Sequence, residues 1–223
     1  MTLSTSRDRD NLAEPPVADQ GRNARALLAR CGGCGYLPRN SKEPGAGGRC
    51  QLRTPMSPRG YDLIVLGDFR FPGGTSTAIA EELSAGAAAG YRIGLVQIKG
   101  PVLKRPHPFH PRIRACIDDR RVDLIDPDQP VEGRLLLAHH PSLFTHRPSQ
   151  GLHVAAERKL LVVWHPPLDG LGAPAYDWAG IDRNARGVLG EDLLWAPVGP
   201  LVRAQFETVE DSPPLFEIGR AHV

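Results

Sequence analysis

The stretch YDLIVLGDFRFPGG (residues 61–74) decides the fold of this chain, together with TSTAIAEELSAGAAAG (75–90) and YRIGLVQI (91–98) that follow it. The first segment opens with an apolar run and the third ends in one, and both runs are typical of buried strands. The second has the pattern of a helix, with Gly90 as its stop. Together they predict a strand–loop–helix–strand unit, and the loop lies at the carboxyl end of the first strand, where open α/β sheets bind ligands.

The loop of this unit contains Gly73 and Gly74, directly before the helix. Glycine lets the backbone approach a ligand closely, and a helix amino terminus favours an anion. We expect Thr75, Ser76 or Thr77 to cap the helix. The three-glycine spacing of a dinucleotide fingerprint is absent, so the unit indicates a fold and a site without naming a reaction.

The rest of the chain continues the same alternation. Helices are expected at residues 113–121, after Pro111, and at 176–189. An α/β fold with a doubly wound parallel sheet and right-handed crossovers follows from strands that alternate with helices. The expected strands are residues 63–66, 93–98, 122–125, 135–138, 160–164 and 193–196.

The amino-terminal stretch 1–58 has a different character. It is rich in Arg, Gly, Pro and Ser, and only residues 24–30 hint at a helical turn. Such a composition buries too little apolar surface to fold, so we interpret it as a disordered tail or a spurious extension upstream of a natural start at Met56. Residues 1–57 carry nine Lys/Arg and five Asp/Glu, a net charge of +4.

Composition narrows the class of protein. The 223 residues have a formal net charge of only +2, which gives no case for nucleic-acid binding. No apolar run approaches the roughly 20 residues of a membrane span, and no signal peptide opens the chain. We expect a cytoplasmic protein with possible peripheral contact to a membrane through its substrate.

Cysteines do not predict a disulfide framework or a complete metal site. Cys31, Cys34 and Cys50 offer three thiolates in the tail without a fourth ligand, and the Cys31–Cys34 pair lacks the βαβ context of a redox motif. We therefore interpret these three cysteines as chance occurrences in the tail without a shared role. Cys116 falls inside a predicted helix and is expected in the core.

Polar residues follow three of the predicted strands. Because the carboxyl ends of parallel strands meet at one edge, we expect these residues to converge on one cleft. Histidine at such an edge suits a sugar hydroxyl or a leaving phosphate, whereas the competing interpretation is a hydrogen-bonded strand-end residue. His139 should point to the opposite face from His140. The candidates are Asp68, Arg70, Gly73, Gly74, Thr75, His140 and His165.

Three other interpretations have weaker support. A metal site at His139, His140 and His165 lacks a helical pair of ligands or clustered carboxylates, so no metal is expected. Ser142 lacks the glycine-flanked elbow of a hydrolase. The basic loop of residues 99–114 could face an anionic acceptor, but a solvated loop is the commoner case.

The chain resembles the amino-terminal half of a GT-B glycosyltransferase of the group 1, or subfamily 4-like, kind. Residues 73–74, Glu82-Leu83 and 90–93 carry the resemblance, with Tyr91 where the family commonly has His. The strands that end at His140 and His165 are similar to family strands, and the latter presents an active-site His. The resemblance covers about residues 60–205.

The resemblance implies a Rossmann-like, acceptor-side domain at residues 59–216. The full enzyme would move a sugar from a nucleotide-sugar donor to a saccharide or lipid-linked acceptor, without a cofactor and often without metal. His165 would be catalytic, and the other candidates would bind substrate. The carboxyl-terminal domain that holds the donor is missing, so we expect the chain as given to be an inactive fragment. The alternative is a non-catalytic α/β module that binds an anionic ligand or a protein partner.

The last seven residues, EIGRAHV (217–223), match the translation of a common sequencing adaptor. We interpret them as a non-native tail from a gene truncated near Phe216.

Overall fold

A computed structural model of the chain describes residues 60–149 and 151–216. The expectations for residues 1–58 and 217–223 therefore lie outside the described residues. The described part is an α/β fold built on one six-stranded parallel sheet in the order β3-β2-β1-β4-β5-β6. This is the strand order of a Rossmann-like sheet, and it reverses direction between β1 and β4.

The strands follow the apolar runs of the sequence. They are β1 (Tyr61–Gly67), β2 (Ile93–Gln97), β3 (Asp123–Ile125), β4 (Val131–His139), β5 (Val154–Val163) and β6 (Leu194–Pro197). All six expected strands are confirmed. β4 and β5 begin earlier than predicted, because exposed polar residues such as Glu132, Arg134, Glu157 and Arg158 interrupt the apolar pattern in the first part of each strand.

The helices are α2 (Gly74–Ala88), α3 (Pro111–Asp118), α4 (Trp178–Leu189) and α5 (Pro200–Thr208), with a short 3-10 helix η1 (Pro141–Phe144). The first three confirm predicted helices within a few residues. α5 was not predicted, although Val202 and Phe206 are spaced four apart and both face the core.

One correction concerns the start of α2. The predicted caps Thr75, Ser76 and Thr77 lie inside the first turn, and Gly73 occupies the cap position with no side-chain cap hydrogen bond. The Thr77 hydroxyl instead donates to the Gly73 carbonyl at 3.2 Å. The predicted stop at Gly90 is confirmed, since Gly90 has φ +80° just beyond the helix.

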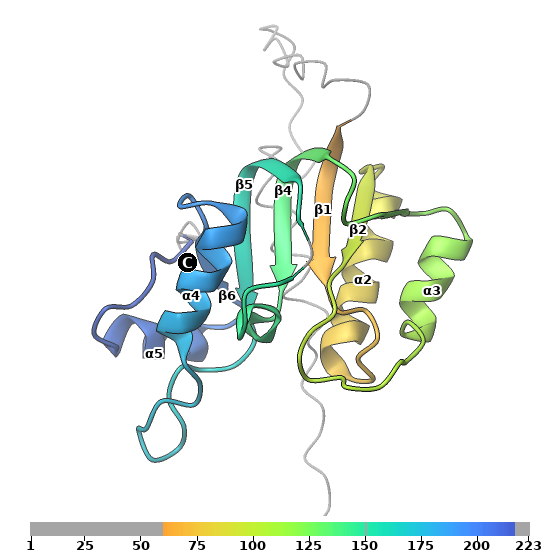
Figure 1. The fold of residues 1–223 in the computed structure, drawn as a ribbon. Helices are drawn as coiled ribbons and strands as arrows, with labels where there is room; N and C mark the ends of the chain where they lie inside the picture. The colour runs from red at the N-terminus through yellow and green to blue at the C-terminus, as the bar shows by residue number, and fades with distance from the viewer. Residues whose placement is uncertain (1–59, 150, 217–223) are drawn as a thin grey trace, which may run out of the picture.

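Helices cover both faces of the sheet (Figure 1). One apolar cluster joins α2 and α3 to one face, and a second joins α4 and α5 to the other. Because successive residues of a strand point to opposite faces, neighbours such as Ile64 and Val65 enter different clusters. Cys116 is 1% exposed in the first cluster, which confirms its place in the core.

Candidate functional site

The candidate site lies where the strand order reverses. β1 and β4 pair in parallel with Leu66 opposite Ala138, so both strands end at the same level. β5 continues this edge, with His139 opposite Val162. All three strands run toward the lower edge in Figure 1. We call the residues just beyond β1, β4 and β5, namely 68–74, 140 and 165, the switch-point edge.

Gly73 opens helix α2 at this edge. Its φ of +148° and ψ of −168° lie in a region that residues with a side chain rarely adopt, and a Cβ placed there would meet nothing within 4 Å. The backbone conformation therefore requires glycine, and the space beside it is open. Since α2 is 15 residues long and has no side-chain cap, the amides of its first turn can receive an anion.

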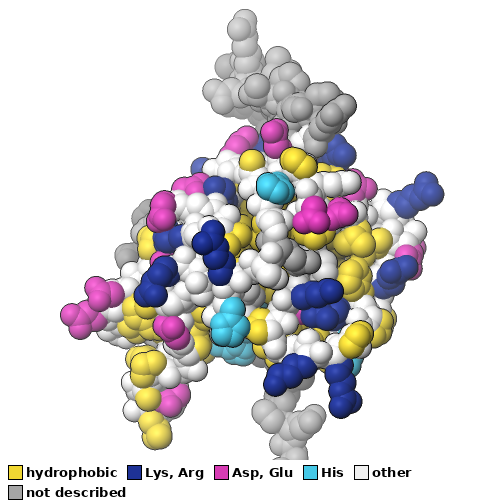
Figure 2. Space-filling view, in the orientation of Figure 1, with side chains coloured by type: hydrophobic (Ala, Val, Ile, Leu, Met, Phe, Trp, Pro, Cys, Tyr) yellow, Lys and Arg dark blue, Asp and Glu magenta, His cyan; other side chains and the backbone are white. Residues whose placement is uncertain are grey.

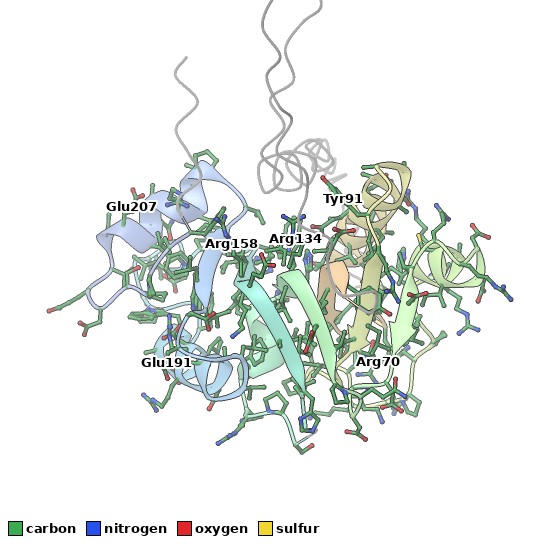
Figure 3. The ribbon with its side chains drawn as sticks, turned by 90° about the horizontal axis from the view of Figure 1, so that it is seen from above. Arg70, Tyr91, Arg134, Arg158, Glu191 and Glu207 are labelled. Atoms are coloured by element: carbon green, nitrogen blue, oxygen red, sulfur yellow. The ribbon has the colours of Figure 1, made fainter. Side chains whose placement is uncertain are left out.

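Asp68 and Arg70 form a buried bidentate pair instead of standing separately. The Arg70 Nε donates to Asp68 Oδ1 at 2.7 Å, and its Nη2 donates to Oδ2 at 2.6 Å. Figure 3 shows Arg70 well apart from Arg134 and Arg158, which belong to the amino-terminal halves of β4 and β5. The two hydrogen bonds between Arg70 and Asp68 hold the loop after β1 in place.

Two more groups hold the Asp68 carboxylate. The Gln97 side chain donates to it at 3.0 Å and the Gly100 amide at 2.9 Å. Burial raises the pKa of Asp68, but the hydrogen bonds from Arg70, Gln97 and Gly100 outweigh it, and the net pKa is lowered. Asp68 is therefore a charged anchor, and any direct contact with a ligand falls to Arg70, whose Nη1 has no partner among the described residues.

The two predicted histidines of the edge lie together. The rings of His140 and His165 meet edge to face with centroids 5.3 Å apart. His140 has φ +86°, an uncommon conformation for a non-glycine residue, and it is part-buried, whereas His165 is exposed. The structure thus brings together side chains that follow two adjacent strands.

Hydrogen bonding fixes the tautomer of neutral His140. Its Nδ1 accepts from the Ser142 amide at 3.2 Å and lies 2.7 Å from the Ser142 hydroxyl. Nδ1 is then an acceptor, and the proton resides on Nε2. Burial, followed by the neighbouring His165 and His139, lowers the pKa of His140 to about 4. At neutral pH the ring is an uncharged hydrogen-bond donor.

Sequence reasoning missed a buried layer behind this edge. His139, the last residue of β4, points toward α2, where its Nε2 lies 2.9 Å from Oε2 of Glu82 and both side chains are 3% exposed. The His139 ring also stacks on Trp164, with centroids 6.4 Å apart. The available signal was Glu82 itself, a charged residue three positions after Ile79 on the buried face of a helix.

Within residues 60–149 and 151–216, no three His, Cys, Asp or Glu side chains gather as a metal site. None of the described helices combines the length and apolar character that a bilayer crossing needs. No protein-family model, curated protein or solved structure matches the chain. Any function must therefore be argued from the geometry of the edge.

Proposed function

We propose that this domain binds a phosphate-bearing sugar ligand at the switch-point edge and forms the acceptor-side half of a GT-B glycosyltransferase. The complete enzyme would move a sugar from a nucleotide-sugar donor to a saccharide or lipid-linked acceptor. The observation that carries the proposal is the opening of α2. Its amino terminus is uncapped, follows a glycine-only conformation, and lies beyond the strand at which the sheet order reverses.

The chemistry of the edge supports a ligand with both phosphate and hydroxyl groups. Free amides and the dipole at the start of α2 favour a phosphate, and the open space at Gly73 admits it. A neutral His140 can donate from Nε2 to a sugar hydroxyl without the cost of burying a charge. A guanidinium anchored by Asp68 adds a fixed positive charge.

In sugar transfer, negative charge develops on the phosphate that leaves the donor. Hydrogen-bond donors of the protein that already point at this developing charge lower the barrier, because they need no reorganisation during the reaction. The exposed His165 is the proposed contact to the reacting sugar or its phosphate, and the amides of Gly74 and Thr75 would hold the phosphate. These roles rest on the family resemblance together with the geometry of the edge.

The test is titration of the isotope-labelled protein with inorganic phosphate, uridine diphosphate and uridine diphosphate glucose, followed by amide NMR. We expect shifts at Gly73, Gly74 and Thr75. Gly73→Ala should weaken binding at least tenfold, since the strained backbone would displace the loop. Thr75→Asp places a negative charge in the first turn, which favours the helix but repels an anion.

Gly187→Ala is the matched control, because Gly187 lies exposed in α4 with nothing within 4 Å of a Cβ. Unchanged affinity for all three probes in folded Thr75→Asp would refute the site. Equal binding of phosphate and of the two nucleotides would show an anion site without recognition of the sugar or the nucleotide, which is the behaviour of a non-catalytic module for an anionic ligand.

A further inference from the structure

His140, the residue just beyond β4, has a backbone conformation that few residues with a side chain adopt. Its φ is +86° and its ψ is 124°. The other non-glycine residues with positive φ among those described, Arg120 and Asp211, have φ of 55° and 56°. Glycine adopts positive φ readily, whereas a residue with a side chain is strained there. Such strain persists only where surrounding contacts fix the residue.

Hydrogen bonds fix both the backbone and the ring of His140. Its amide donates to the Val162 carbonyl of β5 at 3.3 Å, and its carbonyl accepts from the Leu143 amide at 3.2 Å. The ring is held at Nδ1, which accepts from the Ser142 amide at 3.2 Å and lies 2.7 Å from the Ser142 hydroxyl. The other ring nitrogen, Nε2, has no hydrogen-bond partner among the described residues.

Helix α4 anchors the far end of the same turn, η1. The side-chain amide of Asn184 donates to the Phe144 carbonyl at 3.0 Å and to the Thr145 carbonyl at 3.4 Å. The Phe144 side chain is fully buried in the core. The turn is therefore held at both ends, by α4 at one and by β5 at the other. This keeps Ser142 in place, and Ser142 keeps the ring of His140 in one orientation.

The oriented ring lies where a ligand can reach it. His140 is half-buried and the neighbouring His165 is exposed. Figure 2 shows histidine side chains at the surface toward the lower edge, the side on which β1, β4 and β5 end in Figure 1. Because Nδ1 is occupied by Ser142 and the lowered pKa of His140, about 4, keeps the ring uncharged at neutral pH, Nε2 can only donate.

We propose that Ser142 and Asn184 are positioning residues, which hold His140 so that its Nε2–H donates to an oxygen of the sugar. The inference rests on the proposed function, because a ligand that carries a sugar must occupy the switch-point edge. It assigns recognition of the sugar to the turn after β4, separately from the phosphate at the opening of α2. It also accounts for a strained histidine at a position where glycine would be unstrained.

The test is calorimetric titration of the full chain with uridine diphosphate and with uridine diphosphate glucose at neutral pH. Ser142→Ala should weaken binding of the sugar nucleotide about threefold to tenfold, since the ring of His140 loses the hydroxyl that orients it. Binding of uridine diphosphate should change less than about twofold, because the amides of α2 hold the phosphate. Ser142→Thr keeps a hydroxyl and should restore the affinity.

Asn184→Leu should show the same selective loss, about twofold to fivefold, because the far end of η1 is released. Gly187→Ala is the matched control on the same helix, since Gly187 is exposed and a Cβ there meets nothing within 4 Å. It should leave the affinity for both nucleotides unchanged. Circular dichroism confirms that each variant is folded.

A double variant tests whether Ser142 acts through His140. His140→Gly suits the backbone and removes the ring, so its thermal midpoint should equal or exceed that of His140→Ala. It should bind the sugar nucleotide about tenfold more weakly than the wild type. Adding Ser142→Ala to His140→Gly should cause no further loss, because no ring is left to orient, whereas a merely structural role of Ser142 would add its own loss.

Three results would overturn the inference and leave the anion site in place. They are equal losses for the two nucleotides in Ser142→Ala, unchanged affinity for the sugar nucleotide in folded His140→Gly, and a further loss in the double variant. If the wild-type protein binds neither nucleotide, the proposed function fails and this inference fails with it.

Discussion

Replacing Glu82 or His139 alone should destabilise the fold, whereas replacing both together should not. Both side chains are 3% exposed, and Nε2 lies 2.9 Å from Oε2 but is not aligned as a hydrogen-bond donor to it. His139 Nδ1 and Glu82 Oε1 have no hydrogen-bond partner among the described residues. The pair therefore bears a desolvation cost that its own contacts offset only in part.

Single replacements should be costly and unequal. His139→Phe leaves a carboxylate buried without its partner, and we expect a loss of about 3–5 kcal/mol in the free energy of unfolding. Glu82→Met leaves one polar ring without its partner in place of an unpaired carboxylate, so the expected loss is smaller, about 1–3 kcal/mol. The free energy of unfolding of the double variant should lie within about 1 kcal/mol of the wild type or exceed it, because apolar packing replaces two buried polar side chains.

Urea denaturation followed by tryptophan fluorescence measures these values, and Trp164 reports directly because it stacks on His139. Glu81→Met is the matched control. Glu81 is the preceding residue of the same helix, its side chain is 46% exposed, and it pairs with Arg112 on the surface, so the expected loss is below about 1 kcal/mol. A double variant that loses the sum of the two single losses would refute the coupling.

Two further predictions concern stability. The lowered pKa of His140, about 4 against 6.5 in the unfolded chain, means that the unfolded state takes up the proton first as pH falls. Stability should therefore be constant above about pH 6.5 and decline toward pH 4, by at most about 1.4 kcal/mol per pH unit from this group, and His140→Asn should flatten that decline in urea midpoints between pH 7 and 4.5. Identical slopes in both proteins would contradict the assignment. Gly187→Ala should raise the free energy of unfolding by about 0.5–1 kcal/mol, since it removes backbone entropy from α4 without a steric contact, and a lower thermal midpoint would contradict this.

The fold could be predicted from the sequence because the sheet is buried on both faces. Each central strand contains a continuous apolar run, such as Leu63 to Leu66, and such runs need no tertiary information to be recognised. Parallel pairing then brings the strand ends to one edge, so His140 and His165 could be expected together from topology alone. The cap of α2 could not be predicted from the sequence, because threonine and serine are commoner caps than glycine. The unusual backbone conformation of Gly73 depends on the loop as a whole.

The sequence pattern did not predict which side chains contact one another. Asp68 and Arg70 were predicted as ligand contacts, but nothing in the sequence indicated that they bind one another or that Gln97, 29 positions away, completes their network. Glu82 and His139 are 57 positions apart and meet only because α2 packs on the face of the sheet to which His139 points. Such contacts depend on which rotamers the packed sheet permits, and no local period in the sequence records them.

The alternation of strand residues ties the candidate site to the core. His139 and Trp164 stack in the buried layer, and the next residue of each, His140 and His165, forms the pair at the edge. Glu82 connects that buried layer to α2, the helix whose amino terminus is the proposed phosphate site. A change at Glu82 can therefore move both parts of the site without touching a ligand. The Glu82→Met, His139→Phe variant separates the two roles of the pair: if it keeps full stability but loses affinity for the sugar nucleotide, the buried layer positions the edge as well as stabilising the fold.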